Sequence, residues 1–378
     1  MKFALTTTAL VLVLGLAAPA LADIKIGATI SETGPAAFLG DPEAKTLKML
    51  VEEINAAGGV NGEKLELVIY DDGGDPNKAR TFATRLVEDD EVVAVIGGTT
   101  TGTSMAIIPV FEDAEVPFIS LAGAIEIIDP VKPYTFKTPH TDRMACAKIF
   151  EDMKKNGITK IGMISGSDGF GASMHKQCLS IVGDYGIEVL ADETYGPTDA
   201  DMTPQLTNIR SKGEVQAILN PGFGQGPAIV TRNYGQLGIK TPLYQSHGVA
   251  SKSFIDLAGP ASEGVRLPGT AVLVANLLPA NDPQKAVVSA YTSAYQAKFN
   301  QPASTFGGYA HDGLRLLVDA IKRAGKAEPK AIRDALEGTK GFVGVTGTFN
   351  MAASDHLGLD LSAFRMLEIK GGNWALVQ

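Results

Sequence analysis

Short apolar strands and amphipathic helices alternate along most of this chain, and this alternation restricts its fold more than any other feature. Strand patterns at 24–30, 65–70, 92–96 and 116–120 each end in a turn of glycine, proline or small polar residues, and helical patterns separate them. Strands that alternate with helices form a parallel sheet with helices on both faces. The same order restarts at about residue 144. We therefore predict an α/β fold with two doubly wound parallel-sheet lobes.

The pattern changes after Pro268-Gly269. Residues 271–274 are strand-like, and two long helical patterns then cover 283–299 and 305–323. The extra helical content suits a return of the chain to the first lobe. Strand-like patterns follow at 341–349 and beyond 362, and the chain ends in a predicted hairpin. Tyr134 to Pro139 has the pattern of an extended crossing segment.

The length of 378 residues agrees with two domains. We assign residues 24–141 and 271–340 to lobe 1, and residues 142–270 and 341–378 to lobe 2. The chain then crosses between the lobes more than once. Such a multi-strand hinge predicts a ligand cleft that opens and closes between the lobes.

Residues 1–22 have the pattern of a secretory signal peptide. Lys2 precedes an apolar stretch at 9–16, and Ala20-Leu21-Ala22 is a small-x-small cleavage site. A membrane anchor is the alternative, but the unbroken apolar run is short for a span and Asp23 follows at once. We predict cleavage near Ala22 and export to the periplasm.

Composition and motifs argue against several functions. The formal net charge is -9 and Lys and Arg do not cluster, so nucleic acid is not an expected partner. Gly97 to Gly102 has the spacing of a phosphate loop, but Thr103 stands where that loop requires lysine. The five histidines have no metal-ligand spacing with each other or with the cysteines. We predict no enzyme activity, no metal and no cofactor.

The two cysteines, Cys146 and Cys178, fall on predicted helices that flank one strand. An exported protein permits a disulfide between them. Two buried free thiols are equally compatible with the sequence, so both possibilities stay open.

Two turns follow neighbouring strands of the first lobe. Gly97-Gly98 leads into 99–104, which has five hydroxyls and one glycine at the start of a helix, and the next strand ends in Leu121-Ala122-Gly123-Ala124. Parallel sheets bind ligands at the carboxyl ends of their strands. Hydroxyls, turn amides and a helix N-terminus favour a carboxylate there. The alternative is that the hydroxyls only cap the helix.

The second lobe has two aromatic residues in glycine-rich turns. Phe170 lies in Gly169-Phe170-Gly171, and Phe223 lies in Gly222-Phe223-Gly224. Two aromatic rings over a cleft would enclose an apolar ligand. The alternative is that both rings pack on neighbouring helices. A third turn contains Ser246-His247-Gly248.

Six short motifs along the mature chain resemble those of type I periplasmic solute-binding proteins of the leucine/isoleucine/valine-binding family, which serve ABC importers of hydrophobic amino acids and related acids. The resemblance implies a monomer with a cleft between its lobes and an ABC permease in the inner membrane as its partner. The motifs are Ser31-Glu32-Thr33-Gly34-Pro35 through Gly40, Tyr70-Asp71-Asp72, Asp75-Pro76, Val95-Ile96-Gly97, Tyr134-Thr135-Phe136-Lys137-Thr138 and Phe170-Gly171.

The resemblance also implies roles for individual residues. It places Thr101 and the turn at 122–124 at the ligand carboxylate and Leu39 near the apolar end of the ligand. Phe170 and Phe223 then close over the ligand, at positions where amino-acid binders of the family often have tyrosine. The predicted ligand-binding residues are Leu39, Thr101, Ala122, Gly123, Ala124, Phe170, Phe223 and His247.

His247 departs from the family pattern. Branched-chain amino-acid binders have a glutamate at this turn that accepts the ammonium of the ligand, and a buried ammonium needs such a carboxylate. Histidine does not supply one, which predicts a small hydrophobic carboxylate without an α-ammonium, with an aromatic acid favoured. A hydrophobic amino acid is the alternative ligand if Glu126 or Asp168 reaches the ammonium. A sensor that signals to a membrane receptor is the alternative class of function.

Overall fold

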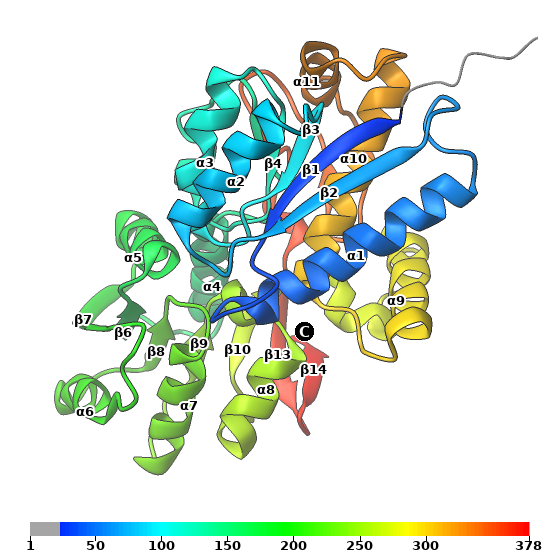
Figure 1. Ribbon diagram of the computed structural model, residues 1–378. Helices are drawn as coiled ribbons and strands as arrows, with labels where there is room; N and C mark the ends of the chain where they lie inside the picture. Colours follow the sequence, from blue (N-terminus) through cyan, green and yellow to red (C-terminus); the bar gives the residue numbers. More distant parts are fainter. Residues whose placement is uncertain (1–22, 378) are drawn as a thin grey trace, which may run out of the picture.

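The computed structural model describes residues 23–377, so the predicted signal segment lies outside the described part (Figure 1). The first of two large sheets has the strand order β2-β1-β3-β4-β5, and its neighbouring strands are parallel. Its strands are β1 (Ile24–Ile30), β2 (Leu65–Asp71), β3 (Ala94–Gly97), β4 (Phe118–Ser120) and β5 (Thr135–Lys137). The segment that the sequence analysis treats as a crossing, 134–139, thus contains the edge strand of this sheet.

Helices cover both faces of the first sheet, because its central strands are apolar on both sides. Ile96 packs in one core with α1 and α10, and its neighbour Val95 packs in another core with α2 and α3. These helices are α1 (Ala37–Ala56), α2 (Pro76–Glu88), α3 (Thr101–Asp113) and α10 (Thr305–Ala324).

The second sheet has the order β14-β13-β10-β9-β8-β6-β7, with parallel pairs from β10 to β7 and antiparallel pairs for β13 and β14. Met163 and Ile164, adjacent in β6, again face separate cores. The strands are β6 (Lys160–Gly166), β7 (Glu188–Tyr195), β8 (Ala217–Asn220), β9 (Leu243–Gln245), β10 (Arg266–Gly269), β13 (Arg365–Lys370) and β14 (Asn373–Leu376). The predicted fold class, two doubly wound parallel-sheet lobes, is confirmed.

Helices also cover both faces of this second sheet. Those of one core are α4 (Asp142–Lys155) and α5 (Gly169–Ile181), and those of the other are α6 (Thr203–Ser211), α7 (Gly226–Gln236) and α8 (Lys252–Ala258). Single turns of 3-10 helix are η1 (Ile125–Ile127), η2 (Val182–Tyr185), η3 (His247–Val249), η4 (Gly259–Ser262) and η6 (Leu361–Ala363). Among residues 23–377, no helix has the length and apolar character needed to cross a membrane.

The chain after β10 packs back on the first lobe, through α9 (Lys285–Phe299), α10 and α11 (Pro329–Glu337). The predicted strand at 271–274 is wrong: these residues begin the 3-10 segment η5 (Ala271–Leu277). β10 ends just before them and takes the place in the sheet that a strand would need.

The lobe boundaries expected from the sequence group residues 341–360 with lobe 2, but the contacts of these residues are with the first lobe. They contain a small hairpin of β11 (Phe342–Val343) and β12 (Thr348–Phe349). The carboxylate of Asp312 on α10 accepts hydrogen bonds from the amides of Val345 and Thr346, both at 2.8 Å. His356 Nδ1 lies 2.8 Å from the carbonyl oxygen of Thr135 on β5. These contacts join the segment to the first lobe, and only β13 and β14 join the second sheet.

The second lobe contains a disulfide between Cys146 on α4 and Cys178 on α5, so the structure has the first of the two possibilities that the sequence left open. Both residues are fully buried in the core that these helices share. The bond therefore fixes α5, the helix that begins at the cleft, to the neighbouring helix of the same lobe.

We expect the Cys146→Ala/Cys178→Ala double variant to be less stable than the oxidised protein. The cysteines are 32 residues apart, and a closed loop of that size restricts the unfolded chain by about 3–4 kcal/mol. Urea unfolding of both proteins measures the difference, and reduction should bring the wild-type protein close to the variant. Equal free energies of unfolding for the oxidised protein and the variant contradict this expectation.

Candidate functional site

The hydroxyls of the Thr-rich turn after β3 have different roles. Thr100 and Thr103 form a capping box at the start of α3, with 3.1 Å from each backbone amide to the hydroxyl of the other residue. Ser104 Oγ lies 2.7 Å from Ser120 Oγ, which ties α3 to the end of β4. The hydroxyl of Thr101, by contrast, is buried and has no hydrogen-bond partner among residues 23–377. The capping interpretation therefore holds for Thr100, whereas the hydroxyl of Thr101 takes no part in the cap.

The neighbouring turn at 121–124 is held from behind by the end of β5 and the start of α4. The carbonyl oxygen of Gly123 accepts hydrogen bonds from Lys137 Nζ and from the amide of Asp142, both at 3.0 Å. Lys137 is fully buried, and burial lowers its pKa to about 7, although Asp142 acts in the opposite direction. The amide of Ala122 donates to Ser120 Oγ at 3.2 Å. The positions of these backbone groups are therefore fixed before any ligand arrives.

Two elements of the second lobe place aromatic side chains in the cleft. Phe170 stands in the first turn of α5, where the carboxylate of Asp168 accepts from the amides of Phe170 and Gly171 at 3.0 and 3.1 Å. Phe223 follows β8, and its ring centroid is 6.2 Å from that of Phe170, with the rings edge to face. Phe223 also stacks on Phe38 of the first lobe at 6.4 Å. The aromatic contacts therefore extend across the cleft.

His247 begins η3 directly after β9 and is almost fully buried, with 3% of its surface exposed. Its ring is 5.3 Å from that of Phe170, edge to face. Burial is the main cause that lowers the pKa of His247 to about 3, and the charge of Lys137 acts in the same direction. The imidazole is therefore neutral at pH 7. Its Nδ1 has no hydrogen-bond partner within the described range.

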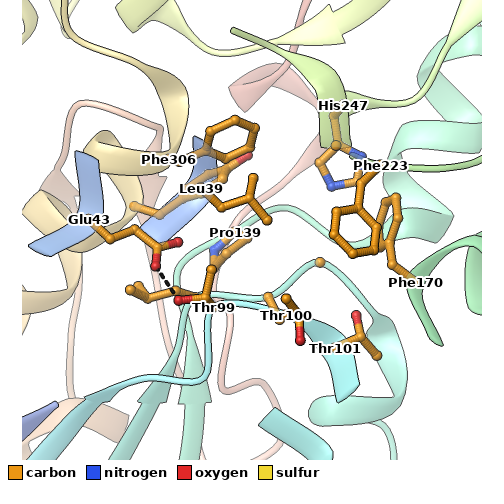
Figure 2. A pocket seen from close by; sticks show the side chains of 15 residues that line it. Leu39, Glu43, Thr99, Thr100, Thr101, Pro139, Phe170, Phe223, His247 and Phe306 are labelled. Atoms are coloured by element: carbon orange, nitrogen blue, oxygen red, sulfur yellow. Dashed lines mark hydrogen bonds between the residues drawn. The ribbon is translucent and has the colours of Figure 1, made fainter. Parts of the chain in front are cut away.

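These residues enclose one cavity between the lobes (Figure 2). Its volume is about 40 Å³, on a scale where a water molecule needs roughly 10–15 Å³. The cleft is thus nearly closed, and a benzoate-sized ligand requires the facing rings to move apart. Of the predicted site residues, Leu39, Thr101, Ala122, Gly123, Phe170, Phe223 and His247 line the cavity.

The eighth predicted residue, Ala124, is fully buried but is not part of the cavity lining, because it packs in the core formed with α2 and α3. Glu126 and Asp168, the sequence-based candidates for an ammonium partner, are not in the lining either. Glu126 forms an ion pair with Lys176 at 2.7 Å, and Asp168 caps α5.

The cavity also has lining residues that the sequence analysis missed, and Glu43 is the most polar of them. It is buried on α1, and the hydroxyl of Thr99 donates to its Oε2 at 2.6 Å. A signal existed in the sequence, since Glu43 lies four residues before Leu47 on the apolar face of this helix. Thr99, Thr100, Leu121 and Gly248 also line the cavity and lie in turns that the sequence singles out, although they are not among the predicted ligand-binding residues. Pro139, Phe306 and Tyr309 are further missed residues.

Comparisons with known proteins agree with this architecture. The model of the family described as "Periplasmic binding protein" matches residues 23–373. The leucine-, isoleucine-, valine-, threonine- and alanine-binding protein of Pseudomonas aeruginosa is 29% identical over 317 residues, which are 83% of this chain and 82% of that protein. The Leu/Ile/Val-binding protein homolog 7 of Brucella abortus is 27% identical over 338 residues, covering 85% and 82% of the two chains.

Solved structures are similar over nearly the whole chain. An extracellular ligand-binding receptor from Rhodopseudomonas palustris HaA2 has a TM-score of 0.88 and 30% identity, with coverage of 94% of this chain and 100% of the other. The branched-chain amino acid transporter substrate binding protein LivJ of Streptococcus pneumoniae, in complex with isoleucine, has a TM-score of 0.83 and 27% identity, covering 93% and 97%.

The fold and the cleft between its lobes thus define a solute-binding protein. The chain belongs to the type I periplasmic binding proteins, in the leucine/isoleucine/valine-binding family. Its relatives are solute-binding proteins and not enzymes, as the sequence analysis predicts for this chain.

We expect buried His247 to make the ligand-free protein less stable in acid. The pKa of His247 is about 3 in the folded protein, whereas the ordinary value of 6.5 applies to the unfolded chain. Between these values the unfolded chain binds the proton and the folded chain does not, so the free energy of unfolding falls as the pH decreases from 6.5 towards 3. The His247→Gln variant should lose less stability over this range, by roughly 3–5 kcal/mol. Urea unfolding at a series of pH values measures this, and identical pH profiles would contradict it.

We expect the Gly123→Ala variant to bind ligand at least roughly 10-fold more weakly. A Cβ atom at Gly123 would lie 2.7 Å from Phe170 Cε2 and 3.1 Å from His247 Nε2, both in the opposite lobe. Closure of the cleft would therefore be hindered, whereas the open protein would keep its stability.

Gly183→Ala in η2 is the matched control, since a Cβ there would have no heavy atom within 4 Å. Titration calorimetry with the ligand that gives the largest thermal shift compares the two variants. Equal affinities for both would show that Gly123 does not limit closure.

Proposed function

We propose that this protein is the extracytoplasmic solute-binding component of an ABC importer of the branched-chain amino acid type, and that its ligand is a small hydrophobic carboxylate, with an aromatic acid favoured. The observation that carries the proposal is the buried, neutral His247 that faces Gly123 across the cleft, where amino-acid binders of the family have a glutamate. We expect an exported protein that acts as a monomer after cleavage near Ala22.

The charges around the cavity support an acid without an ammonium group. A buried ammonium without a carboxylate partner costs several kcal/mol. His247 supplies no negative charge, and Glu126 and Asp168 lie outside the cavity lining. Burial also raises the pKa of Glu43 well above its usual value, which favours its uncharged form.

The other end of the cavity suits a carboxylate. The N-terminus of α3 is at the cavity, and the unpartnered hydroxyl of Thr101 is available to donate. The start of α5 approaches from the opposite lobe, since a Cβ at Gly169 would be 3.6 Å from the amide nitrogen of Gly102. The N-terminus of α3 favours an anion at this end of the cavity, whereas the amides at the start of α5 already donate to the carboxylate of Asp168.

A bound ligand would hold the lobes together because it touches both. Thr101 and Leu39 belong to the first lobe, and Phe170, Phe223 and His247 to the second. Contacts that exist only in the closed state shift the equilibrium towards it. The closed form is then the one expected to dock on the permease. The ligand binds and leaves without any covalent bond being broken.

The alternative ligand is a branched-chain or other hydrophobic amino acid. The relative from Pseudomonas aeruginosa has such ligands in its name, and the Streptococcus pneumoniae structure contains isoleucine. In this chain Glu43 would then have to be ionised to accept the ammonium. A sensor that feeds a membrane receptor is the alternative class, and the same cleft would serve it.

A ligand panel tests the proposal. The chain from Asp23 to Gln378 is unfolded and refolded to remove bound ligand, and thermal shifts are recorded with leucine, isoleucine, valine, phenylalanine, benzoate, 4-hydroxybenzoate, phenylacetate, coumarate and urea. A ligand well above its Kd adds a few kcal/mol of apparent stability. Stabilisation by aromatic acids alone supports the proposal, and stabilisation by leucine or valine supports the amino-acid alternative.

We expect His247→Glu to weaken binding of the acid that gives the largest shift by roughly 100-fold, because the new carboxylate would repel the ligand or stay protonated at a cost. Titration calorimetry measures the change. His247→Gln is the matched control and should retain more of the affinity, since its amide still donates a hydrogen bond. Unchanged affinity in His247→Glu would mean that His247 does not contact the ligand.

A further inference from the structure

Glu43 has one carboxyl oxygen engaged and one free. The hydroxyl of Thr99 donates to Oε2 at 2.6 Å, and the same hydroxyl accepts from the amide of Ser31 at 3.0 Å. The proton of the Thr99 hydroxyl is therefore donated to Oε2. Within residues 23–377, Oε1 has no hydrogen-bond partner. Figure 2 shows the free oxygen pointing away from Thr99 towards the interior of the pocket.

The surroundings of Glu43 decide its protonation. The residue is 1% exposed, and burial is the main cause that raises its pKa well above the usual value. The charge of nearby Asp72 adds to the rise, and the hydrogen bond from Thr99 opposes it. No cation within the described chain pairs with Glu43. Because Oε2 already accepts from Thr99, the proton of the neutral acid belongs on Oε1, the oxygen that faces the cavity.

Glu43 lies at the end of the cavity away from the carboxylate site. Figure 2 shows Glu43 and Phe306 on one side of the pocket, and Phe170 and His247 on the other. The hydroxyl of Tyr309, which also belongs to a lining residue, is buried and has no partner in the described part of the chain. Buried donors without partners are unfavourable. A mainly apolar cavity with the Tyr309 hydroxyl and the free carboxyl oxygen of Glu43 in its lining is suited to a ligand oxygen.

We infer that Glu43 determines ligand specificity by donating a hydrogen bond from its carboxylic acid group to a second, uncharged oxygen of the ligand. The ligand class is then a small hydrophobic acid with a hydroxyl or carbonyl oxygen remote from its carboxylate, such as a ring-hydroxylated benzoate. The inference rests on the proposed function, since it takes an organic acid in this cleft as given. It assigns a role to a residue that neither the turns nor the aromatic motifs indicate.

Titration calorimetry with paired ligands tests the inference. Benzoate, 3-hydroxybenzoate and 4-hydroxybenzoate are titrated into the wild-type protein and into Glu43→Gln and Glu43→Leu variants. The wild-type protein should prefer one hydroxybenzoate over benzoate by at least roughly 10-fold. Glu43→Gln should keep most of this preference, because its amide oxygen accepts from Thr99 and its NH₂ group donates into the cavity. Glu43→Leu should bring the ratio of the two affinities close to one.

The ratio separates a ligand contact from a structural role, because general damage to the fold weakens both ligands alike. Glu126→Gln is the matched control, an acidic residue outside the cavity lining, and it should leave both affinities unchanged. If Glu43→Leu does not fold, as judged by circular dichroism, Glu43→Met takes its place. A wild-type ratio in the apolar variant, or no preference in the wild-type protein, overturns the inference while the proposed function stands.

Failure of the proposed function has a different signature. The wild-type protein would then bind none of the benzoates and would bind leucine or valine. Titration of that amino acid into the Glu43→Gln variant then shows whether Glu43 is ionised. A loss of affinity of more than roughly 100-fold would assign Glu43 as the ionised partner of the ammonium and would overturn the inference that Glu43 is an uncharged donor. Affinity within a few fold of wild type would support an uncharged Glu43.

Discussion

The contact between the turn at Gly123 and the aromatic rings of the opposite lobe is the constraint on which the closed cleft depends. Gly123 has no side chain, so Phe170 and His247 approach its Cα closely. Lys137 holds the same turn from behind through the carbonyl oxygen of Gly123. The first lobe thus offers a fixed backbone surface, and the second lobe closes on it with side chains.

The electrostatics of the cavity follow from burial. His247 and Glu43 are both enclosed, and enclosure favours the uncharged form of each. The positive end of α3 remains as a fixed partial charge near Thr101, while the carboxylate of Asp168 caps the start of α5. The proposed monoanionic ligand, rather than a zwitterion, is the one that matches a cavity with neutral side chains and the N-terminus of α3.

Much of the site was predictable because parallel sheets bind ligands where their strands end. Thr101 and the turn at Gly123 follow neighbouring strands, so their closeness follows from strand order alone. Phe170 and Phe223 in glycine-rich turns were predictable for the same reason. Glu43 escaped prediction because it lies in mid-helix, where an acidic residue is usually exposed. The placement of residues 341–360 on the first lobe was also not predictable, since the hydrogen bonds to Asp312 join residues more than thirty positions apart.

The sequence by itself determined the alternation of strands and helices, and with it two doubly wound lobes, because hydrophobic period and turn residues are local properties. It also determined the chemistry available at each strand end. Only the tertiary structure decided which hydroxyl stays free, that Cys146 and Cys178 form a disulfide, and that Glu43 faces the cavity. These outcomes depend on distances and burial between segments far apart in the chain, and local patterns contain no information on either.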